Sequence, residues 1–231
     1  MPKSKTLSHV FDADTSRSIL KLRSDGYIGE LSGVLGSGKE SYVFYSQDSH
    51  NREVAVKVHR HYINAFNGIP SYLRLRGSKT GGFFKRIDDW TRYEFSLLRK
   101  ANEAGVNTPE PIRNYKNIIV MSFIGKDGVP AMMAYKDTAF DIKYWYDKIT
   151  GFIIKMGKVG MIHGDLSPYN ILNNEGEPYL IDFSQSLKLA SLTKDYLLRD
   201  IKNINQWFQK LGKIEIMPEE KIMEMIGFDG G

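Results

Sequence analysis

The sequence predicts an α+β fold with two lobes, in which a β-rich first lobe carries one main helix and a reduced second lobe is mostly helical. Strand-like runs crowd the segment 31–58, a single helical pattern follows at 88–104, and helical patterns dominate after residue 137. The chain has 231 residues, enough for one two-lobed domain. We therefore expect a helical N-terminal extension over 1–28, the first lobe over 29–121, and the hinge with the second lobe over 122–231.

The first lobe is expected to begin with a short helix and to continue with strands. Asp14 or Thr15 can cap a helix that runs to Arg23, and Gly26 ends it. Between residues 31 and 58, the runs LSGVL, SYVFYS and EVAVKV have the apolar and β-branched character of strands. The intervening turn DSHNRE predicts that the last two strands form a hairpin.

One helix and one buried strand complete the first lobe. The segment 88–104 repeats apolar residues at helical spacing, and Gly105 is placed to end that helix. Pro109 and Pro111 then break the chain, and the run IIVMSFI, bounded by Gly125, is typical of a buried strand. The two lobes are expected to join at the end of this run.

The second lobe is predicted to consist of helices around two short strands. A long helix with one apolar face is expected from about Asp137 to Val159, and Gly160 closes it. The runs NILN and PYLIDF flank a turn at Glu175–Gly176 and indicate strands. Two further helices are expected over 193–211 and 218–226.

Composition narrows the classes of function. The sequence has no cysteine, which excludes disulfides, thiolate metal sites and a cysteine nucleophile, and fits a reducing, cytoplasmic location. The first residues, MPKSKTLSHVFDAD, lack an apolar stretch, and no run is long enough to span a membrane, so neither a signal peptide nor a membrane is expected. The net charge of +5 permits nucleic-acid binding without proving it.

The stretch HGDLSPYN, together with the apolar run YLIDF that follows it, carries the strongest functional signal. It places Asp165, Asn170 and Asp182 at the spacing of a protein-kinase-type active site. In such a site one Asp handles the acceptor hydroxyl, and the Asn and the second Asp hold the metal ions on ATP. Metal ions must neutralise the charged phosphoryl group, and hard cations take oxygen ligands. For HGD alone, the alternative is a polar loop with a solvated Asp and a capping Asn.

Two charged residues of the first lobe fit the same site. Lys57 ends the strand VAVK, where a buried lysine needs a partner for its charge, although a surface lysine on an edge strand is the alternative. Glu94 is the preferred partner, because its i−4, i+3 and i+4 neighbours are apolar: Trp90, Leu97 and Leu98. The rival carboxylates on the same helix are Asp88, Asp89 and Glu103.

The segment GSGKESYVF, which follows one predicted strand and runs into the next, is a candidate phosphate loop. Its small residues and backbone amides can approach phosphates closely, although a simple strand–turn–strand connection is the alternative. It narrowly misses a Walker A motif, because Glu40 stands where a Ser or Thr must ligate magnesium. Strand-like residues follow where a P-loop requires a helix, so a P-loop NTPase is rejected.

Together these segments resemble the RIO family of atypical serine protein kinases. The resemblance runs from SRSILKLRSDGYIGELSG through GKES, VAVK, MSFIG and HGDLSPYNIL to IDFSQS and LLRDIKNIN. Within the family it is closest to the type-1 branch, because roughly 30 residues before the first strand leave no room for the winged-helix domain of the type-2 branch. GKES, however, is similar to the type-2 loop, since the type-1 pattern usually has Ala at the position of Ser41.

The resemblance implies a bilobal protein-kinase-like fold that binds ATP with Mg2+ or Mn2+. It implies that Asp165 is the catalytic Asp and that Asn170 and Asp182 are metal ligands. Lys57, paired with Glu94, would hold the phosphates. The other implied nucleotide contacts lie in the phosphate loop, the strands beside it and the hinge: Ser37, Gly38, Lys39, Glu40, Ser41, Val43, Ala55, Met121, Ser122, Phe123 and Ile124.

The resemblance also implies a function and its alternatives. The family is an ATP-dependent serine/threonine protein kinase with autophosphorylation, acting on the small ribosomal subunit precursor, so that particle is an expected partner of a monomer or weak oligomer. One alternative is an ATPase-gated assembly factor with little protein kinase activity, and another is a small-molecule phosphotransferase related to aminoglycoside kinases. Ser184 replaces the usual Gly after Asp182-Phe183, and little chain precedes the next helix, so a conventional peptide groove is not expected.

Two further expectations concern residues that the site assignment does not include. Asp200, in LLRDIKN, is a candidate to support the catalytic loop, against the commoner case of a solvated helix Asp. The segment 60–87 carries six basic and no acidic residues, interleaved with aromatic residues, and can be an RNA contact or merely a soluble loop. Its candidate phosphate acceptors are Ser71, Ser78 and Thr80.

Overall fold

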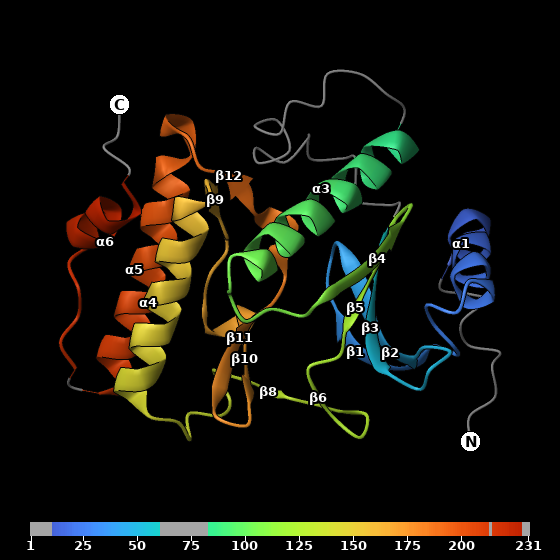
Figure 1. Cartoon of the computed structure of the whole chain (residues 1–231), viewed down its shortest axis with the longest axis horizontal. Helices are drawn as coiled ribbons and strands as arrows, with labels where there is room; N and C mark the ends of the chain where they lie inside the picture. The colour runs from blue at the N-terminus through green and yellow to red at the C-terminus, as the bar shows by residue number, and fades with distance from the viewer. Residues whose placement is uncertain (1–10, 61–82, 213, 228–231) are drawn as a thin grey trace. The chain divides into compact units, whose positions relative to one another are not determined.

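The computed structural model describes residues 11–60, 83–212 and 214–227, and they form two compact units. Among the described residues, the first unit comprises 11–60, 83–93 and 111–123, and the second comprises 94–110, 124–212 and 214–227. The first contains a β-sheet and the second is mainly helical, which confirms the predicted bilobal α+β class (Figure 1). The predicted domain ranges themselves stay predictions.

The first unit contains a five-stranded antiparallel sheet with the order β1-β2-β3-β5-β4. Its strands are β1 (Ser32–Ser37), β2 (Ser41–Gln47), β3 (Glu53–His59), β5 (Ile118–Ser122) and β4 (Pro111–Tyr115). The sequence predicted all of them except β4, whose place was taken to be a break at Pro109 and Pro111. A proline is tolerated here because β4 is an edge strand and Pro111 is its first residue.

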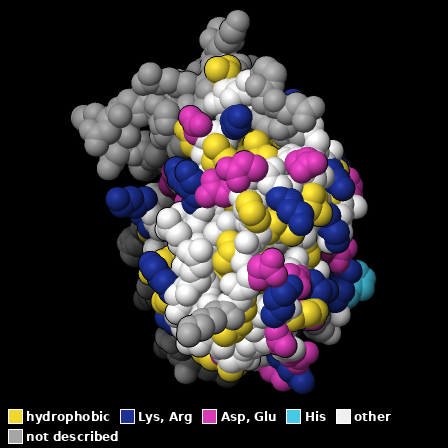
Figure 2. Space-filling view, turned by 90° about the vertical axis from the view of Figure 1, so that its left-hand side faces the viewer, with side chains coloured by type: hydrophobic (Ala, Val, Ile, Leu, Met, Phe, Trp, Pro, Cys, Tyr) yellow, Lys and Arg dark blue, Asp and Glu magenta, His cyan; other side chains and the backbone are white. Residues whose placement is uncertain are grey.

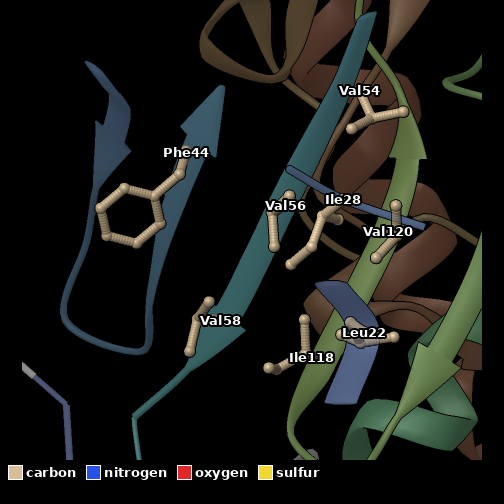
Figure 3. Close-up of a cluster of buried hydrophobic side chains, with 8 residues drawn as sticks. All are labelled: Leu22, Ile28, Phe44, Val54, Val56, Val58, Ile118 and Val120. Atoms are coloured by element: carbon tan, nitrogen blue, oxygen red, sulfur yellow. The ribbon is translucent and has the colours of Figure 1, made fainter. Parts of the chain in front are cut away.

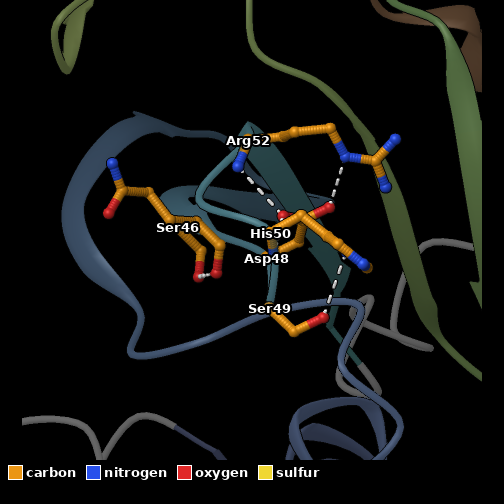
Figure 4. A network of polar contacts seen from close by, with 6 residues as sticks. Ser46, Asp48, Ser49, His50 and Arg52 are labelled. Carbon is orange, nitrogen blue, oxygen red and sulfur yellow. Dashed lines mark hydrogen bonds and ion pairs between the residues drawn. The ribbon is translucent and has the colours of Figure 1, made fainter.

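The turn between β2 and β3 is held by one buried carboxylate, that of Asp48. Its Oδ1 accepts the backbone N–H groups of His50 at 2.8 Å and Arg52 at 2.9 Å, and its Oδ2 accepts Arg52 Nε at 2.7 Å (Figure 4). Burial opposes ionisation, but these hydrogen bonds from Arg52 and His50 outweigh it and lower the pKa of Asp48. The predicted hairpin is thereby confirmed and its register fixed.

One face of the sheet carries the core of the first unit. Val54, Val56 and Val58 alternate along β3 toward this face and meet β5, β2 and helix α1 (Ala13–Ser24) (Figure 3). The remaining members of the cluster are Leu22, Ile28, Phe44, Ile118 and Val120. The N-cap of α1 is Asp12, not Asp14 or Thr15 as predicted, because the Asp12 side chain accepts the N–H of Thr15 at 2.8 Å.

Helix α3 (Phe83–Glu103) begins five residues before the predicted start at Asp88. Residues 83–87 contain no glycine or proline, so nothing in that segment stops the helix from extending toward Gly82. Ile87 and Trp90 are buried, as are Leu97 and Leu98 about two turns after Trp90. The predicted apolar face of this helix is therefore confirmed.

The second unit is built on three helices: α4 (Ile142–Lys158), α5 (Lys194–Leu211) and α6 (Glu219–Ile226). The first of these starts at Ile142, and not at about Asp137, because the side chain of Asp141 caps it. Trp145, Ile149 and Phe208 are fully buried among the helices. Gly157 lets α6 approach α4, since a Cβ there would overlap the side chain of Ile226.

Short strands complete the second unit. The predicted hairpin is observed as β10 (Ile171–Asn174) and β11 (Glu177–Leu180), and β8 (Met132–Met133) pairs with β10. A separate ladder joins β9 (Met161–Ile162) to β12 (Leu187–Lys188), and β6 (Gly125–Lys126) pairs with β7 (Val129–Pro130). Two-residue strands have no periodicity to read, which explains why the sequence did not predict them.

On the face drawn in Figure 2, basic and acidic side chains are interspersed, so its described part presents no region of a single sign. None of the described helices combines the length and the apolar character needed to cross a membrane.

Candidate active site

The HGDLSPYN segment forms a loop between β9 and β10 that is anchored at its first residue. His163 is completely buried, and its Nε2 lies 3.0 Å from the carbonyl oxygen of Ile181. Its ring also packs against Phe183, with 4.9 Å between the centroids. This histidine therefore ties the start of the loop to the IDF segment, a role that the sequence did not predict.

Asp165 and Asn170, at opposite ends of the loop, lie in direct contact. Asn170 Nδ2 donates to the backbone oxygen of Asp165 at 2.8 Å and to its Oδ2 at 3.2 Å. A 3-10 turn, η3 (Pro168–Asn170), brings the amide back toward the carboxylate. Asp165 is exposed while Gly164 and Leu166 on either side are buried, so the carboxylate stands out from an anchored backbone.

Asp200 of α5 supports this loop, as the sequence suggested. Its Oδ2 accepts the N–H of Gly164 at 2.7 Å, and its Oδ1 accepts the N–H of Leu166 at 2.9 Å. The side chain is almost completely buried, and burial raises its pKa to about 7 even though both N–H groups favour the ionised form. The alternative of a solvated helix Asp is therefore wrong.

Asp182 occupies a conformation that non-glycine residues rarely adopt. Its φ of 62° and ψ of 77° lie in the left-handed region, and its Oδ1 accepts the N–H of Ser184 at 3.2 Å. This caps the short helix η4 (Phe183–Gln185). Strained backbone of this kind is found where a side chain must be aimed at a ligand. The N–H of Ile181 also donates to the oxygen of Asn170 at 3.0 Å, which joins the two segments.

The environment adjusts the basicity of the Asp165 carboxylate. Partial loss of water raises its pKa above the usual range, the hydrogen bond from Asn170 opposes that effect, and the negative charge of Asp182 adds to it. A carboxylate with a raised pKa is a better proton acceptor while it is ionised. This property suits a residue that handles the proton of an attacking hydroxyl.

The donor atoms fit a magnesium–nucleotide complex. The amide nitrogen of Asn170 is used by Asp165, so the amide oxygen is the atom that Asn170 presents to a cation. Within the described ranges, no group of three or more His, Cys, Asp or Glu side chains could hold a metal alone. Mg2+ is usually bound by one or two protein oxygens together with substrate phosphates and water. Asn170 and Asp182 carry oxygen atoms of the kind that such a partial set needs, and their role as metal ligands stays a prediction.

In the first unit, the structure places four predicted nucleotide contacts on one face of the sheet. Because Val54, Val56 and Val58 face the core, Ala55 and Lys57 face the other side of β3. Val43 is directly opposite Lys57, and Met121 is directly opposite Ala55. Lys57 is only 4% exposed, which excludes the alternative of a surface lysine on an edge strand.

The GSGKES segment is a tight turn between β1 and β2. The N–H of Gly38 donates to the oxygen of Ser41 at 2.9 Å, and Ser37, Gly38 and Lys39 are exposed. Glu40 and Ser41 are partly buried, and β2 begins at Ser41. A strand, and not a helix, follows the turn, which confirms that this is no P-loop. Its contact with phosphates stays a prediction.

Glu94 and the hinge residues are positioned, but the pairings predicted for them stay predictions. Glu94 is 3% exposed, as its apolar neighbours indicated. Ser122 ends β5, the N–H of Phe123 donates to the oxygen of Glu53 at 3.2 Å, and the oxygen of Ile124 accepts the N–H of Ala131 at 3.0 Å. The two units divide between Phe123 and Ile124, inside the predicted hinge.

The basic and aromatic segment yields no structural test. Ser71, Ser78 and Thr80, together with most of the basic residues predicted to contact RNA, lie outside the described residues. Their roles therefore stay predictions.

Comparison with known proteins agrees with the fold and the motifs. The family model described as "RIO domain" matches residues 42–222. The RIO-type serine/threonine-protein kinase Rio1 of Methanocaldococcus jannaschii is 33% identical over 214 residues, which cover 89% of this chain and 72% of that protein. Rio1 of Haloferax volcanii is 29% identical, covering 90% and 73% respectively. The human serine/threonine-protein kinase RIO1 is 28% identical, and this chain spans only 40% of its length.

Two solved structures share the fold. The Rio2 kinase–ADP/Mg2+–phosphoaspartate complex from Chaetomium thermophilum has a TM-score of 0.72 and 23% sequence identity, covering 92% of this chain and 65% of that one. The Rio2 kinase from the same organism has a TM-score of 0.71 and 24% identity, covering 92% and 68%. At this level of identity, the likeness concerns the fold.

Proposed function

The chain belongs to the RIO family of serine/threonine-protein kinases, in its type-1 branch, and we propose that it transfers the γ-phosphoryl group of ATP by way of Asp165. One observation supports this proposal most strongly. An exposed carboxylate with a raised pKa stands on a backbone anchored by Asp200, and it touches the amide of Asn170. A site for phosphoryl transfer needs this combination of a positioned proton acceptor and oxygen donors for a metal.

Each residue of the site has a proposed role. Asp165 accepts the proton of the attacking hydroxyl, and Asn170 and Asp182 hold Mg2+, or alternatively Mn2+. The metal, when bound, neutralises negative charge on the phosphates. Lys57, buried on the sheet face that it shares with Val43 and Ala55, neutralises further charge on the nucleotide.

Phosphate release and protein labelling, measured side by side, test the proposal. With radiolabelled ATP and Mg2+, we expect both products from the wild-type chain and neither from Asp165→Asn. Aminoglycosides should not be labelled, because the chain belongs to a protein kinase family. Full turnover in the Asp165→Asn variant would show that the reaction does not need the Asp165 carboxylate, and would contradict its assignment as the proton acceptor.

A second candidate function, an ATPase that gates assembly, is favoured by the segment after the IDF motif. The chain from Leu187 to Thr193 is occupied by β12 and a single 3-10 turn, η5 (Ser191–Thr193), and α5 starts at Lys194. Thr193 Oγ1 holds this segment compact by accepting the N–H of Ala190 at 2.9 Å and donating to the oxygen of Lys188 at 2.9 Å. So compact a segment offers little surface for a peptide substrate.

The chemical stability of the bond between the phosphoryl group and the protein separates these two functions. A phosphoserine from kinase activity resists hydroxylamine, whereas an acyl phosphate on an aspartate, of the kind named for the Rio2 complex, is cleaved by it. Labelling that hydroxylamine removes, together with rapid phosphate release, would favour the ATPase. Hydroxylamine-resistant labelling would favour the kinase with autophosphorylation, for which Ser78 is the leading candidate site.

The partner and the location are proposed from the family. We propose that the chain acts in the cytoplasm as a monomer or weak oligomer on the precursor of the small ribosomal subunit, contacting its RNA through the basic segment 60–87. A variant with five basic residues replaced by Ala should bind RNA more weakly, and its binding should depend less on salt. The five changes are Arg74→Ala, Arg76→Ala, Lys79→Ala, Lys85→Ala and Arg86→Ala. Mg-ATP affinity should hardly change. Unaltered RNA affinity and salt slope would exclude this segment as the contact.

A further inference from the structure

The two residues that flank Asp165 have all four of their backbone polar groups bound by side chains of one helix, α5. Asp200 accepts the N–H groups of Gly164 and Leu166. Arg199 Nη2 donates to the oxygen of Gly164, and Asn203 Nδ2 donates to the oxygen of Leu166 at 3.2 Å. Arg199 and Asn203 are four residues apart and therefore lie on the same side of the helix.

These contacts act on different peptide planes. The oxygen of Gly164 belongs to the plane that precedes the Cα of Asp165, and the N–H of Leu166 belongs to the plane that follows it. Arg199 and Asp200 therefore each hold one of the two planes that meet at Asp165. Fixing both planes fixes the direction of the Cα–Cβ bond, and with it the carboxylate. Asn203 holds a plane one step further away.

We propose that Arg199 is a positioning residue for Asp165 and that Asn203 assists it, in support of the phosphoryl transfer proposed above. Gly164, whose φ is +81°, makes such a restraint necessary, because a glycine has more backbone conformational freedom to lose on folding than any other residue. The plane after Asp165 is held twice, by Asp200 and by Asn170 through the oxygen of Asp165. The plane before it depends on Arg199.

Arg199 is suited to this role because its own position is restrained. Its guanidinium lies 5.1 Å from the ring centroid of Tyr196, one turn earlier on α5. A hydrogen bond from a charged donor is roughly twice as strong as a neutral one, and the guanidinium of Arg199 is a charged donor to the oxygen of Gly164.

The test compares Arg199→Ala, Arg199→Lys and Asn203→Ala with Lys202→Ala. Lys202 is the matched control, since it lies on the same helix and is exposed, and its partner is Glu219 at 3.8 Å. Arg199→Ala should lower kcat about 10- to 100-fold with KM for ATP nearly unchanged, because misplacement of a reacting group by about 1 Å costs that much. Arg199→Lys should keep a higher kcat than Arg199→Ala. Asn203→Ala should lower kcat less than Arg199→Ala does, and Lys202→Ala should leave kcat unchanged.

Amide hydrogen exchange provides a readout that does not depend on catalysis. The N–H of Asp165 shares its peptide plane with the oxygen of Gly164, so it should exchange faster in Arg199→Ala than in Lys202→Ala. This holds even if the wild type transfers no phosphoryl group, which separates the two proposals. Unchanged exchange at Asp165, or a loss of kcat that follows the fall in Tm and is not recovered by lysine, would overturn the positioning role.

Discussion

The backbone of Gly164 lies so close to the carbonyl group of Gln185 that a Cβ on residue 164 would overlap it. This contact joins the loop that carries Asp165 to the turn that follows Asp182. Beside this contact, β9 pairs with β12, and Ile162 is opposite Leu187. The segment that carries Asp165 and the segment that follows Asp182 are therefore packed against each other.

Gly164→Ala should damage both stability and catalysis. The alanine must adopt a φ of +81° and displace the Gln185 carbonyl, for a combined cost of roughly 2–5 kcal/mol. Gly160→Ala is the matched control, because Gly160 has a φ of +70° but nothing within 4 Å of an added Cβ. That change should cost only about 1–2 kcal/mol. Denaturant unfolding of both variants would show the difference, and equal costs would contradict the overlap.

The stability of the protein should depend on pH through Asp200. Its folded pKa of about 7 lies above the ordinary value of 3.8, so folding favours the protonated form. Between about pH 4 and about pH 7 the folded state retains a proton that the unfolded state releases, and stability falls as pH rises across this window. The wild type should therefore lose stability relative to Asp200→Asn over this range. A constant difference in unfolding free energy would show that Asp200 titrates normally.

Asp48 provides a control of opposite sign. Its pKa is lowered, because hydrogen bonds from Arg52 and His50 outweigh the effect of burial. The stability that it contributes is therefore present above its ordinary pKa and is lost as pH falls through the lowered value. The Asp48→Asn variant should therefore have a lower free energy of unfolding than the wild type above the ordinary pKa, and this difference should shrink only in strong acid. Chemical denaturation between pH 2 and about pH 7 would measure it.

The sequence predicted regular elements well where a repeating pattern specified them. The apolar and β-branched run EVAVKV predicted the strand that carries Lys57, and helical spacing placed Glu94 on a buried face. Boundaries were less certain, because Asp12, Asp14 and Thr15 are all residue types that can cap a helix. Only the folded backbone decides among them.

The supports of the catalytic loop were harder to predict. Arg199, Asp200 and Asn203 lie more than thirty residues after Gly164 and Leu166, the residues that they hold, and nothing local distinguishes them from solvated helix residues. Asp200 was named as a candidate support in the sequence analysis, whereas Arg199 and Asn203 were not. The role of His163 was also missed, since its hydrogen bond to Ile181 depends on how the two segments pack.

The N-terminal helix should stabilise the sheet that carries Lys57. Leu22 of α1 is 1% exposed in the core of the first unit, whereas Leu20 is 62% exposed on the same helix. Leu22→Ala should therefore lower the free energy of unfolding by about 2–5 kcal/mol. Leu20→Ala should change it by less than about 0.5 kcal/mol, which makes it the control. Similar effects of both changes would mean that α1 does not pack on the sheet in solution.

The two acidic residues of the site should respond differently to substitution. Asp165→Asn should lower kcat about 10²- to 10⁴-fold, the range expected for loss of a general base, while Mg-ATP affinity changes little. Asp182→Asn should also abolish turnover, but by weakening the binding of Mg-ATP, because its carboxylate is assigned to the metal. Calorimetric titration with ATP, with and without Mg2+, would separate these effects.

The titration without Mg2+ makes the distinction sharp. If Asp182 acts only through the metal, Asp182→Asn and the wild type should bind metal-free ATP equally, and the difference should emerge as Mg2+ is added. The backbone of Asp182 allows this comparison, since asparagine also tolerates a φ of 62° and its side-chain oxygen can still accept the N–H of Ser184. Weaker binding of ATP in the absence of Mg2+ would instead show that Asp182 shapes the nucleotide site itself.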